Sequence, residues 1–460
     1  MKRLFSILMI LAMIVTLAAC AQTPTTTAPT TTQAPTTTQT PTTTTEPEPT
    51  YDFGGLTVRL AWGWGPRFTE PGEDKDRFDA RVAEVEEMLN IKFEWVQVDA
   101  GEFWDNMVTN TLAGKSPGTV NFTFPWVFPD WIKAGLPADV NVIAERVGLD
   151  MNDTSWDPLA RIAGTYGDKL YCFDKFPLEV NGGFIFNKRL IEEAGLISPY
   201  EHVEKGTWNW DTLKDYAKKL TKVDADGKTT QYGLTSMNQQ TLADLLILSN
   251  DADLVDVSGA TPKVVTDTEP VLEALSMYQQ LVAVDKSVRM GDPADWESNI
   301  KAFAASEVAM MEAEQWVVDY INTMEPEEFG FVYFPKGPKA TDYISTAGYF
   351  MFWIPANLSE KEQDATLLAY SMIFDNLYPE MSLDDFYAQM GEKYVHDEDG
   401  AAIYADIQVN QRFVMMDGDM FGVDSWALYD LLQTLDYTPQ SAVAEQKPVM
   451  EAAIADFLAK

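Results

Sequence analysis

Cysteine, histidine and basic residues are scarce in this sequence. Two cysteines and two histidines stand among 460 residues, and 33 Lys and Arg face 71 Asp and Glu, which gives a formal net charge of −38. Cys172 is the only cysteine after Cys20, so we expect no disulfide, and one thiol with two histidines makes no zinc-ligand set. A chain this acidic repels nucleic acid and anionic lipid. We therefore expect no nucleic-acid partner, no metal and no cofactor.

Long apolar runs are absent after residue 19, so the sequence predicts no membrane-spanning segment in its folded part. The run that does exist, LFSILMILAMIVTLAA, follows Lys2 and Arg3 and ends in two small alanines. Charge, a short apolar stretch and small residues in this order are typical of an export signal. The stretch LAAC that ends at Cys20 also resembles the lipobox of bacterial lipoproteins, which implies that Cys20 is acylated and becomes the mature N-terminus. The alternative is an ordinary signal peptide that happens to contain a cysteine.

Aromatic and large aliphatic side chains are missing from residues 21–50, which hold 16 Thr and 6 Pro. Such a segment cannot bury a core and is expected to stay extended or disordered. At about 3.1 Å per residue it would reach roughly 90 Å. We interpret residues 1–19 as a signal peptide and residues 20–50 as a lipidated stalk that holds the rest of the protein away from a membrane.

From Leu56 onward the apolar pattern alternates between strand and helix periods. LTVRLAW (56–62) has the period of a strand, and DRFDARVAEVEEMLN (76–90) has a helical apolar stripe that ends at Asn90. SEKEQDATLLAYSMIF (359–374) opens with a capping box made by Ser359 and Glu362. Strands that alternate with helices predict an α/β fold with a largely parallel sheet covered on both faces.

Several longer stretches resemble one known family when they are taken together and in order. The stretches are LAGKSPGTV with DWIKAGL, KLYCFDKFPLEVNGGFIFNKRLIEEAGL, TWNWDTLKDYAKKLT, FAASEVAMMEAEQW and FVYFPKGP. Over residues 54–460 the chain is similar to the extracellular solute-binding proteins of bacterial ABC importers, the group that includes maltodextrin and oligosaccharide binders. Two departures concern the pocket: Tyr171-Cys172-Phe173-Asp174 replaces the family's Tyr-Gly-x-Pro, and Glu314 and Gln315 precede Trp316 where a glycine is common.

The resemblance implies a periplasmic-binding-protein-like fold, with two α/β lobes joined by hinge strands and the ligand between them. Residues 51–178 with 347–400 would form lobe 1, and residues 179–346 with 401–460 would form lobe 2. The chain would cross between the lobes near 176–180, near 345–348 and around residue 400. Ligands of open α/β sheets bind beyond the carboxyl ends of strands, so the loops there are the expected site.

Eight residues are candidates for ligand contact because they lie near strand ends, at hinges, or at positions that match the family's aromatic residues. They are Trp62, Trp64, Trp126, Glu179, Asn181, Trp316, Tyr349 and Trp426. Each has a structural alternative: the aromatic residues could pack in a core, and the polar pair could form hinge hydrogen bonds.

Four other motifs are expected to be structural. Trp208 and Trp210 lie at the start of a helix whose apolar stripe includes Trp210, so we predict that both pack in the core. DADG (224–227) and DEDG (397–400) resemble fragments of calcium loops, but neither continues to the bidentate Glu of an EF-hand. Asp-Gly pairs favour hairpin turns, which is the interpretation we prefer for both. Cys172 lies among aromatic residues and is expected to be an inert buried thiol.

Together with the resemblance, these observations predict a non-enzymatic, monomeric binding protein that captures a carbohydrate, expected to be an oligosaccharide, and delivers it to an ABC permease. Aromatic platforms with carboxylate and amide acceptors suit sugars, which present apolar C–H faces and hydroxyls. Another solute, such as a peptide or a cationic amine, is the main alternative. A secreted glycan-degrading enzyme or a surface adhesion module belongs to another class, and turnover of the ligand would distinguish an enzyme from a binder.

Replacement of Cys20 by Ala tests the lipid anchor. The variant should appear in the medium or accumulate as unprocessed precursor, because the acylated cysteine is the expected attachment to the membrane. Fractionation of cells and immunoblotting would measure this. Correct processing together with continued membrane attachment of the Cys20→Ala protein would contradict the lipobox interpretation.

Overall fold

The structure is a computed structural model that describes most of the chain after residue 50. The described ranges are 51–63, 68–69, 71–124, 127–175, 180–181, 183–257, 261–292, 294–344, 346–347, 351–409, 421 and 423–459. The predicted export signal, Cys20 and the stalk lie outside them. No helix among the described residues is both long and apolar enough to cross a membrane.

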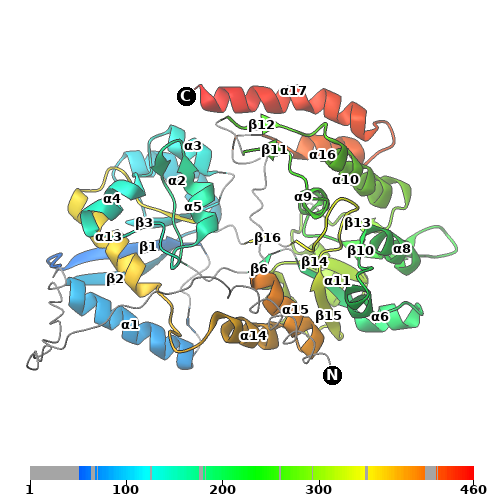
Figure 1. The fold of residues 1–460 in the computed structure, drawn as a ribbon, viewed down its shortest axis with the longest axis horizontal. Coiled ribbons are helices and arrows are strands. Elements are labelled where there is room, and N and C mark those ends of the chain that lie inside the picture. Colours follow the sequence, from blue (N-terminus) through cyan, green and yellow to red (C-terminus); the bar gives the residue numbers. More distant parts are fainter. Residues whose placement is uncertain are drawn as a thin grey trace, which may run out of the picture. The chain divides into compact units, whose positions relative to one another are not determined.

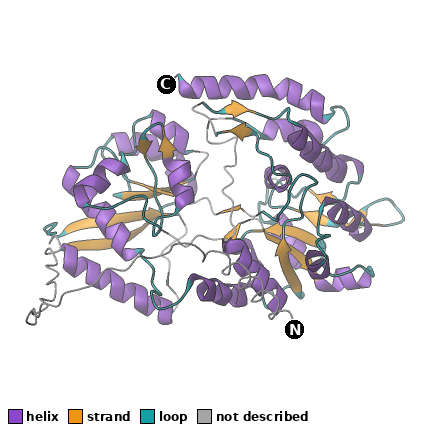
Figure 2. Ribbon diagram, viewed as in Figure 1, coloured by secondary structure: helices purple, strands orange, loops and turns teal. Residues whose placement is uncertain are grey.

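The first sheet has the strand order β17-β3-β1-β2. Its strands are β1 (Leu56–Trp62), β2 (Ile91–Gln97), β3 (Val120–Thr123) and β17 (Met351–Trp353). β1 pairs in parallel with both β2 and β3, whereas β17 pairs antiparallel with β3. Helices flank this sheet (Figures 1 and 2): α1 (Glu73–Leu89), α2 (Ala100–Leu112), α3 (Phe128–Lys133), α4 (Val140–Val147), α5 (Pro158–Gly164) and α13 (Glu360–Ile373). The short strands β4 (Thr165–Tyr166) and β5 (Lys169–Leu170) form a separate hairpin.

The helix ends of this lobe follow the sequence signals. α1 buries Phe78, Val85 and Leu89 and ends at Asn90, whose φ of 49° is left-handed. α13 begins with the predicted capping box, in which Ser359 and Glu362 each bond the backbone N–H of the other. Both caps satisfy backbone groups that a helix end would otherwise leave unpaired. α13 contacts α1, α4 and β1, so a segment from late in the chain completes the first lobe.

The second sheet has the order β13-β10-β14-β7-β15. Its strands are β7 (Gly183–Asn187), β10 (Leu234–Thr235), β13 (Val288–Arg289), β14 (Met310–Ala313) and β15 (Phe329–Tyr333). β10 is parallel to β13 and β14, and β7 is antiparallel to β14 and β15. The strands β10, β13, β14 and β15 therefore run in one direction and end at the same edge. The sheet is mixed, and the largely parallel pattern that we predicted holds for these four strands.

Further helices and two separate small hairpins make up the part of the chain around the second sheet, where β12 packs against α17 (Figures 1 and 2). The helices are α6 (Lys188–Glu193), α7 (Pro199–Glu204), α8 (Trp210–Leu220), α9 (Gln239–Ser249), α10 (Glu269–Gln279) with the π-helical turn η1 (Gln280–Val284), α11 (Ser298–Ala304), α12 (Gln315–Asn322), α14 (Leu383–Tyr394), α15 (Glu398–Val409), α16 (Trp426–Leu432) and α17 (Pro439–Leu458). The hairpins are β8 (Lys222–Val223) with β9 (Thr229–Gln231), and β11 (Val255–Asp256) with β12 (Lys263–Val264).

Two short strands and two helices bear on the predicted crossings between the lobes. β6 (Val180–Asn181) pairs antiparallel with β16 (Thr346–Ala347), in the segments where the first two crossings are expected. α14 contacts α12, and α15 contacts β15. These contacts do not agree with a third crossing around residue 400, because α14 already packs on elements of lobe 2. They favour a crossing between Ile373, where α13 ends, and Leu383, and the lobe boundaries stay a prediction.

The two Asp-Gly motifs have different structures. DADG connects β8 to β9, and the Asp224 carboxylate accepts hydrogen bonds from the N–H groups of Asp226 and Lys228 at 3.0 and 2.9 Å, so the predicted hairpin is confirmed. DEDG is not a hairpin. It begins α15, where Asp397 accepts a hydrogen bond from the N–H of Gly400 at 2.7 Å. The prediction was wrong because Asp caps helix N-termini as readily as it starts turns.

Trp208, Trp210 and Cys172 are buried, as predicted. Burial also raises the pKa of the Cys172 thiol well above its ordinary value, which keeps the thiol protonated and unreactive. The Trp208 indole N–H donates to the Tyr333 carbonyl at 2.7 Å, and the Trp210 indole N–H donates to the Ser249 hydroxyl at 3.0 Å. Both tryptophans thus fix α8 to its neighbours.

The change Trp210→Ala should lower the free energy of unfolding by about 3–5 kcal/mol, since it removes a buried indole and leaves a cavity. Only 7% of Trp210 is exposed. Urea denaturation would measure the loss. Trp426→Ala is the control, because Trp426 is 39% exposed and its truncation should cost far less. Equal losses in the two variants would contradict the assignment of Trp210 to the core.

Candidate functional site

The carboxyl-end edge of the second sheet collects the loops that follow four strands. Ser236 and Met237 follow β10, residues 290–297 follow β13, residues 314–316 follow β14, and Phe334 follows β15. Ligands of α/β sheets bind at such edges, because the loops there are free to vary while the strands hold them in place.

A pair of tryptophans lies at this edge. Trp316 is the second residue of α12 and is half-buried, and its indole N–H donates to the Glu314 carboxylate. The ring of Trp296 lies beside it, with centroids 6.0 Å apart and planes inclined by 48°. Trp296 is 62% exposed although it carries a large apolar ring. The edge therefore presents two indoles and a carboxylate.

Glu312 lies beneath the same edge, on β14, and is fully buried. One of its carboxyl oxygens accepts hydrogen bonds from the Ser236 hydroxyl at 3.0 Å and from the Met237 N–H at 2.6 Å. Burial raises the pKa of Glu312 from its ordinary value of 4.5 to about 8. The group is therefore largely protonated at neutral pH, and it ties the loop after β10 to the central strand of the sheet.

A second network fixes the loop after β13. The Asn299 side chain donates to the Ser236 carbonyl at 2.7 Å and accepts a hydrogen bond from the Arg289 guanidinium. The Thr235 hydroxyl donates to the Arg289 carbonyl at 2.8 Å. The ends of β10 and β13 and the start of α11 are thus held together by hydrogen bonds.

Two tyrosines lie near the carboxyl end of β15: Tyr333 is the last residue of the strand, and Tyr343 comes after it. Tyr333 stacks on Tyr343 with ring centroids 4.6 Å apart, and its hydroxyl donates to the Asp406 carboxylate at 2.5 Å. Lys336 lies over the Tyr343 ring at 4.8 Å. Burial, together with the bond to Asp406, raises the pKa of Tyr333, so the phenol stays protonated. This stack adds a second aromatic group to the edge.

Trp62 ends β1 in the first sheet but lies in the core. Only 6% of it is exposed, and its ring contacts those of Phe122 at 5.4 Å and Phe352 at 5.7 Å. This packing favours the core alternative that the sequence left open. Phe124, which follows β3, is half-buried and lies closer to solvent than Trp62.

The other predicted contacts are placed only in part. Trp64, Trp126, Glu179 and Tyr349 lie outside the described residues, and Asn181 lies in β6, where only its backbone is described. Trp426 begins α16, which packs against α9, α10 and α17. Among the eight candidates, Trp316 is the one that the described edge presents together with a second indole.

Sequence reasoning missed Trp296 and Glu312. DWESNIKAFAAS (295–306) has a helical pattern that includes Trp296, but α11 begins only at Ser298. The aspartates and the proline just before Trp296 were the available signal of a loop. Glu312 gave no signal, since it sits inside an apolar strand pattern and its burial depends on tertiary packing.

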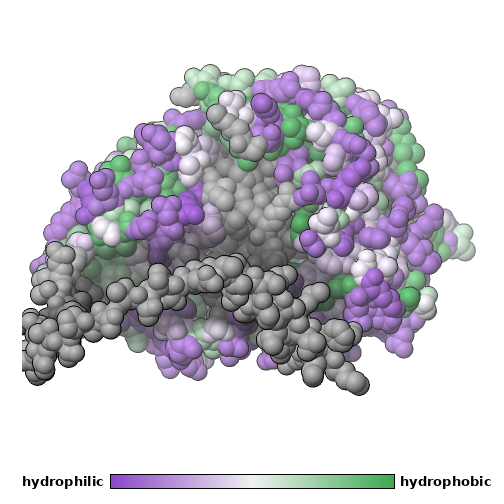
Figure 3. Space-filling model, in the orientation of Figure 1, coloured by the Kyte–Doolittle hydropathy of each residue, from purple (hydrophilic) through white to green (hydrophobic). Residues whose placement is uncertain are grey.

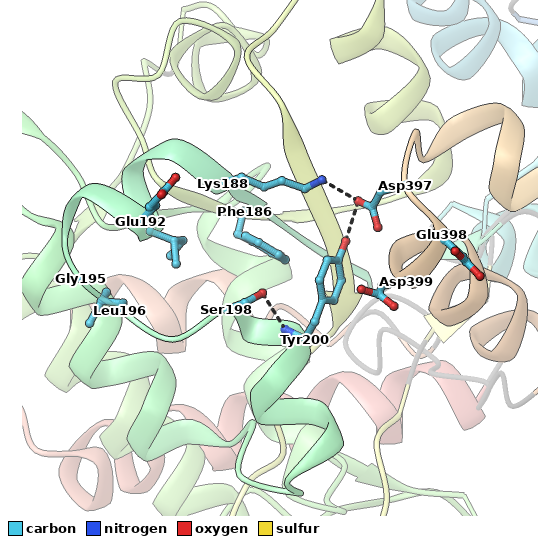
Figure 4. A pocket seen from close by; sticks show the side chains of 11 residues that line it. Phe186, Lys188, Glu192, Gly195, Leu196, Ser198, Tyr200, Asp397, Glu398 and Asp399 are labelled. Carbon is cyan, nitrogen blue, oxygen red and sulfur yellow. Dashed lines mark hydrogen bonds and ion pairs between the residues drawn. The ribbon is translucent and has the colours of Figure 1, made fainter. Parts of the chain in front are cut away.

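Two hollows lie away from this edge. One of about 690 Å³ lies near Phe186, between α6, α7 and the start of α15, and is lined by several acidic residues (Figure 4). There Asp397 pairs with Lys188 at 3.2 Å and accepts the Tyr200 hydroxyl at 2.9 Å, which joins α15 to α6 and α7. The other, of about 260 Å³, lies between the end of β2, α2 and the Lys115–Pro117 turn.

Hydrophilic side chains dominate the coloured surface in Figure 3.

Glu312→Gln should change how stability depends on pH. A carboxyl whose folded pKa is raised from 4.5 to about 8 stabilises the folded state fully below pH 4.5 and loses that contribution as the pH rises towards 8. The amide cannot ionise, so the variant should become more stable than the wild type by a few kcal/mol at pH 8 to 9, since a tenfold change in proton affinity is worth about 1.4 kcal/mol. Denaturation at pH 5 to 9 would measure this.

The exposed Glu307 on the same lobe supplies the control for that experiment. Glu307→Gln should follow the wild-type pH profile throughout. A Glu312→Gln profile parallel to that of the wild type would show that Glu312 is ionised in the folded protein at all of these pH values.

The chain matches known proteins by family and by fold. The model of a family described as bacterial extracellular solute-binding protein matches residues 80–378. No curated protein matches the chain. Among solved structures, the ABC substrate-binding protein Lmo0181 from Listeria monocytogenes, in complex with cycloalternan, aligns with a TM-score of 0.63 and 16% identity, over 87% of this chain and 99% of that one.

Two further structures have the same architecture. UgpB from Mycobacterium tuberculosis, in complex with glycerophosphocholine, aligns with a TM-score of 0.62 and 14% identity, over 88% of this chain and 100% of that one. The cyclic α-maltosyl-1,6-maltose binding protein from Arthrobacter globiformis aligns with a TM-score of 0.60 and 16% identity, over 88% of this chain and 99% of that one. These likenesses support the two-lobed fold. Because the family model spans more than half of the chain, the protein belongs to the bacterial extracellular solute-binding proteins.

Proposed function

We propose that this protein captures a carbohydrate outside the cytoplasm and delivers it to an ABC permease. The observation that carries the proposal is the pair of indoles at the carboxyl-end edge of the second sheet, with the Glu314 carboxylate bonded to one of them. Proteins with the same fold are described in complex with cycloalternan and as a binder of a cyclic maltosyl-maltose.

The chemistry of the edge suits a sugar. A pyranose presents an apolar C–H face that packs on an indole, and its hydroxyls donate hydrogen bonds to carboxylates. Trp316 supplies the flat surface, and Glu314 supplies an acceptor next to it. The protonated Glu312 beneath adds no charge to the edge at neutral pH, so a neutral ligand meets little unpaired charge from it.

A cationic ligand is the second candidate. An ammonium group is attracted to indole faces and to a neighbouring carboxylate, and Trp296, Trp316 and Glu314 offer both. The formal charge of −38 would also attract cations from a distance. Salt distinguishes the two candidates, because the affinity for a cation falls with ionic strength and the affinity for a neutral sugar changes little.

The remaining parts of the proposal concern anchoring and mechanism. Acylated Cys20 and the stalk would tether the monomeric protein to the outer face of the cell membrane, and lobe closure around the ligand would present it to the permease. Trp64, Trp126, Glu179, Asn181, Tyr349 and Trp426 stay candidate contacts. We propose binding without turnover, so bound glycan recovered from the protein should have unchanged mass.

A thermal-shift screen against mono- and oligosaccharides, followed by titration, tests the proposal. A ligand at 100 times its Kd should add about 2.7 kcal/mol to the free energy of unfolding. Trp316→Ala should weaken binding of that ligand by about 1–3 kcal/mol, on the scale of aromatic stacking on a base. The variant should lose less stability than Trp210→Ala, because Trp316 is half-buried.

The two tryptophan variants form a matched pair. Trp210→Ala should melt early, and the molecules that remain folded should bind normally. If Trp316→Ala melts early and Trp210→Ala loses binding, the assignment of site and core is reversed. If no saccharide stabilises the wild-type protein while a cationic solute does, the carbohydrate proposal is wrong.

A further inference from the structure

Four apolar side chains lie together at the edge that carries Trp316. Met290 and Trp296 are exposed, and Met237 and Trp316 are half-buried. All four follow the strands β10, β13 and β14 at their carboxyl ends. Single exposed apolar residues are ordinary, but a group of them in one place marks a contact surface. Trp296 is the largest and most exposed member of this group.

The loop that carries Trp296 is held in shape by its own hydrogen bonds. The Asp292 N–H donates to the Ser298 hydroxyl at 2.8 Å, and the Asp292 carboxylate accepts the Ala294 N–H at 2.9 Å. On the other side of Trp296, Lys301 pairs with Asp295 at 3.1 Å and with Glu297 at 2.8 Å. The residues on both sides of Trp296 are thus held by hydrogen bonds and ion pairs, which lowers the entropy that binding would cost.

Trp316 is fixed as well, by its bond to Glu314 and by packing against the hydrophobic core of the second lobe. The two indoles therefore form a preorganised surface with two planes. Their inclination of 48° means that one flat sugar ring cannot lie against both faces. Their centroids lie 6.0 Å apart, so the two inclined planes lie next to each other on one surface.

We infer that Trp296 is a ligand-binding residue that contacts the sugar ring next to the one held by Trp316, so that the site selects saccharides of two or more rings. The inference rests on the proposed function and adds to it a residue and a minimum ligand length. In this arrangement Trp316 provides the contact that every bound saccharide makes, and Trp296 provides the contact that only a longer one makes.

The test compares ligand lengths in Trp296 variants of the full chain. A glycan array identifies the saccharide series that the wild-type protein binds, and calorimetry then measures its mono-, di- and trisaccharide. Trp296→Ala should weaken the affinity for the di- and trisaccharide by about tenfold and the affinity for the monosaccharide by less than about twofold, since one stacked ring is lost. Trp296→Phe should restore most of the affinity, because a ring face is kept.

Leu435→Ala is the control, since Leu435 is an apolar residue of similar exposure, at 67%, in the turn after α16. It should leave binding unchanged, and neither alanine variant should alter the melting temperature. Equal weakening at all ligand lengths, no weakening at all, or a wild-type protein that binds monosaccharides as tightly as oligosaccharides would overturn the inference and leave the proposed function standing. A wild-type protein that binds no saccharide would overturn both.

Discussion

Four strands of the second sheet end at one edge, and the candidate site depends on that alignment. β14 lies between β10, which runs parallel to it, and β7, which runs antiparallel. Because β13 and β15 share the direction of β14, the residues that follow these strands converge although they are far apart in sequence. Trp296 and Trp316 are neighbours for this reason. Helix packing behind the sheet leaves the loops at the edge free to carry polar and aromatic side chains.

The buried Glu312 shows how the edge is kept in shape. Burying a carboxyl group costs free energy unless it is protonated or paired, and here it is protonated at neutral pH and accepts two hydrogen bonds from the loop after β10. An apolar residue could fill the same space, but it would leave the Ser236 hydroxyl and the Met237 N–H without this acceptor. Glu312 therefore lowers the stability of the folded protein at alkaline pH, and its two hydrogen bonds fix the loop after β10.

The sequence predicted the parts of the fold that depend on local pattern. The strand–helix alternation, the end of α1 at Asn90 and the capping box of α13 follow from periodicity and capping. The site depends on tertiary packing and was predicted only in part. Trp62 ends one apolar strand pattern and Trp316 follows another, yet Trp62 is enclosed by Phe122 and Phe352 and Trp316 is only half-buried. Nothing local distinguishes them, because the enclosing rings come from β3 and β17.

Charge and shape together limit the ligand. An anionic solute would have to approach a chain with 71 acidic and 33 basic residues, and it would meet Glu314 at the indole pair. Several of the cations are already engaged at the surface, as with Lys301 between Asp295 and Glu297. What remains at the edge is stacking area and hydrogen-bond acceptors. A ligand that gains from both is flat-faced, rich in hydroxyl or ammonium donors and free of negative charge, and among such ligands the inclined indoles favour one with more than a single ring.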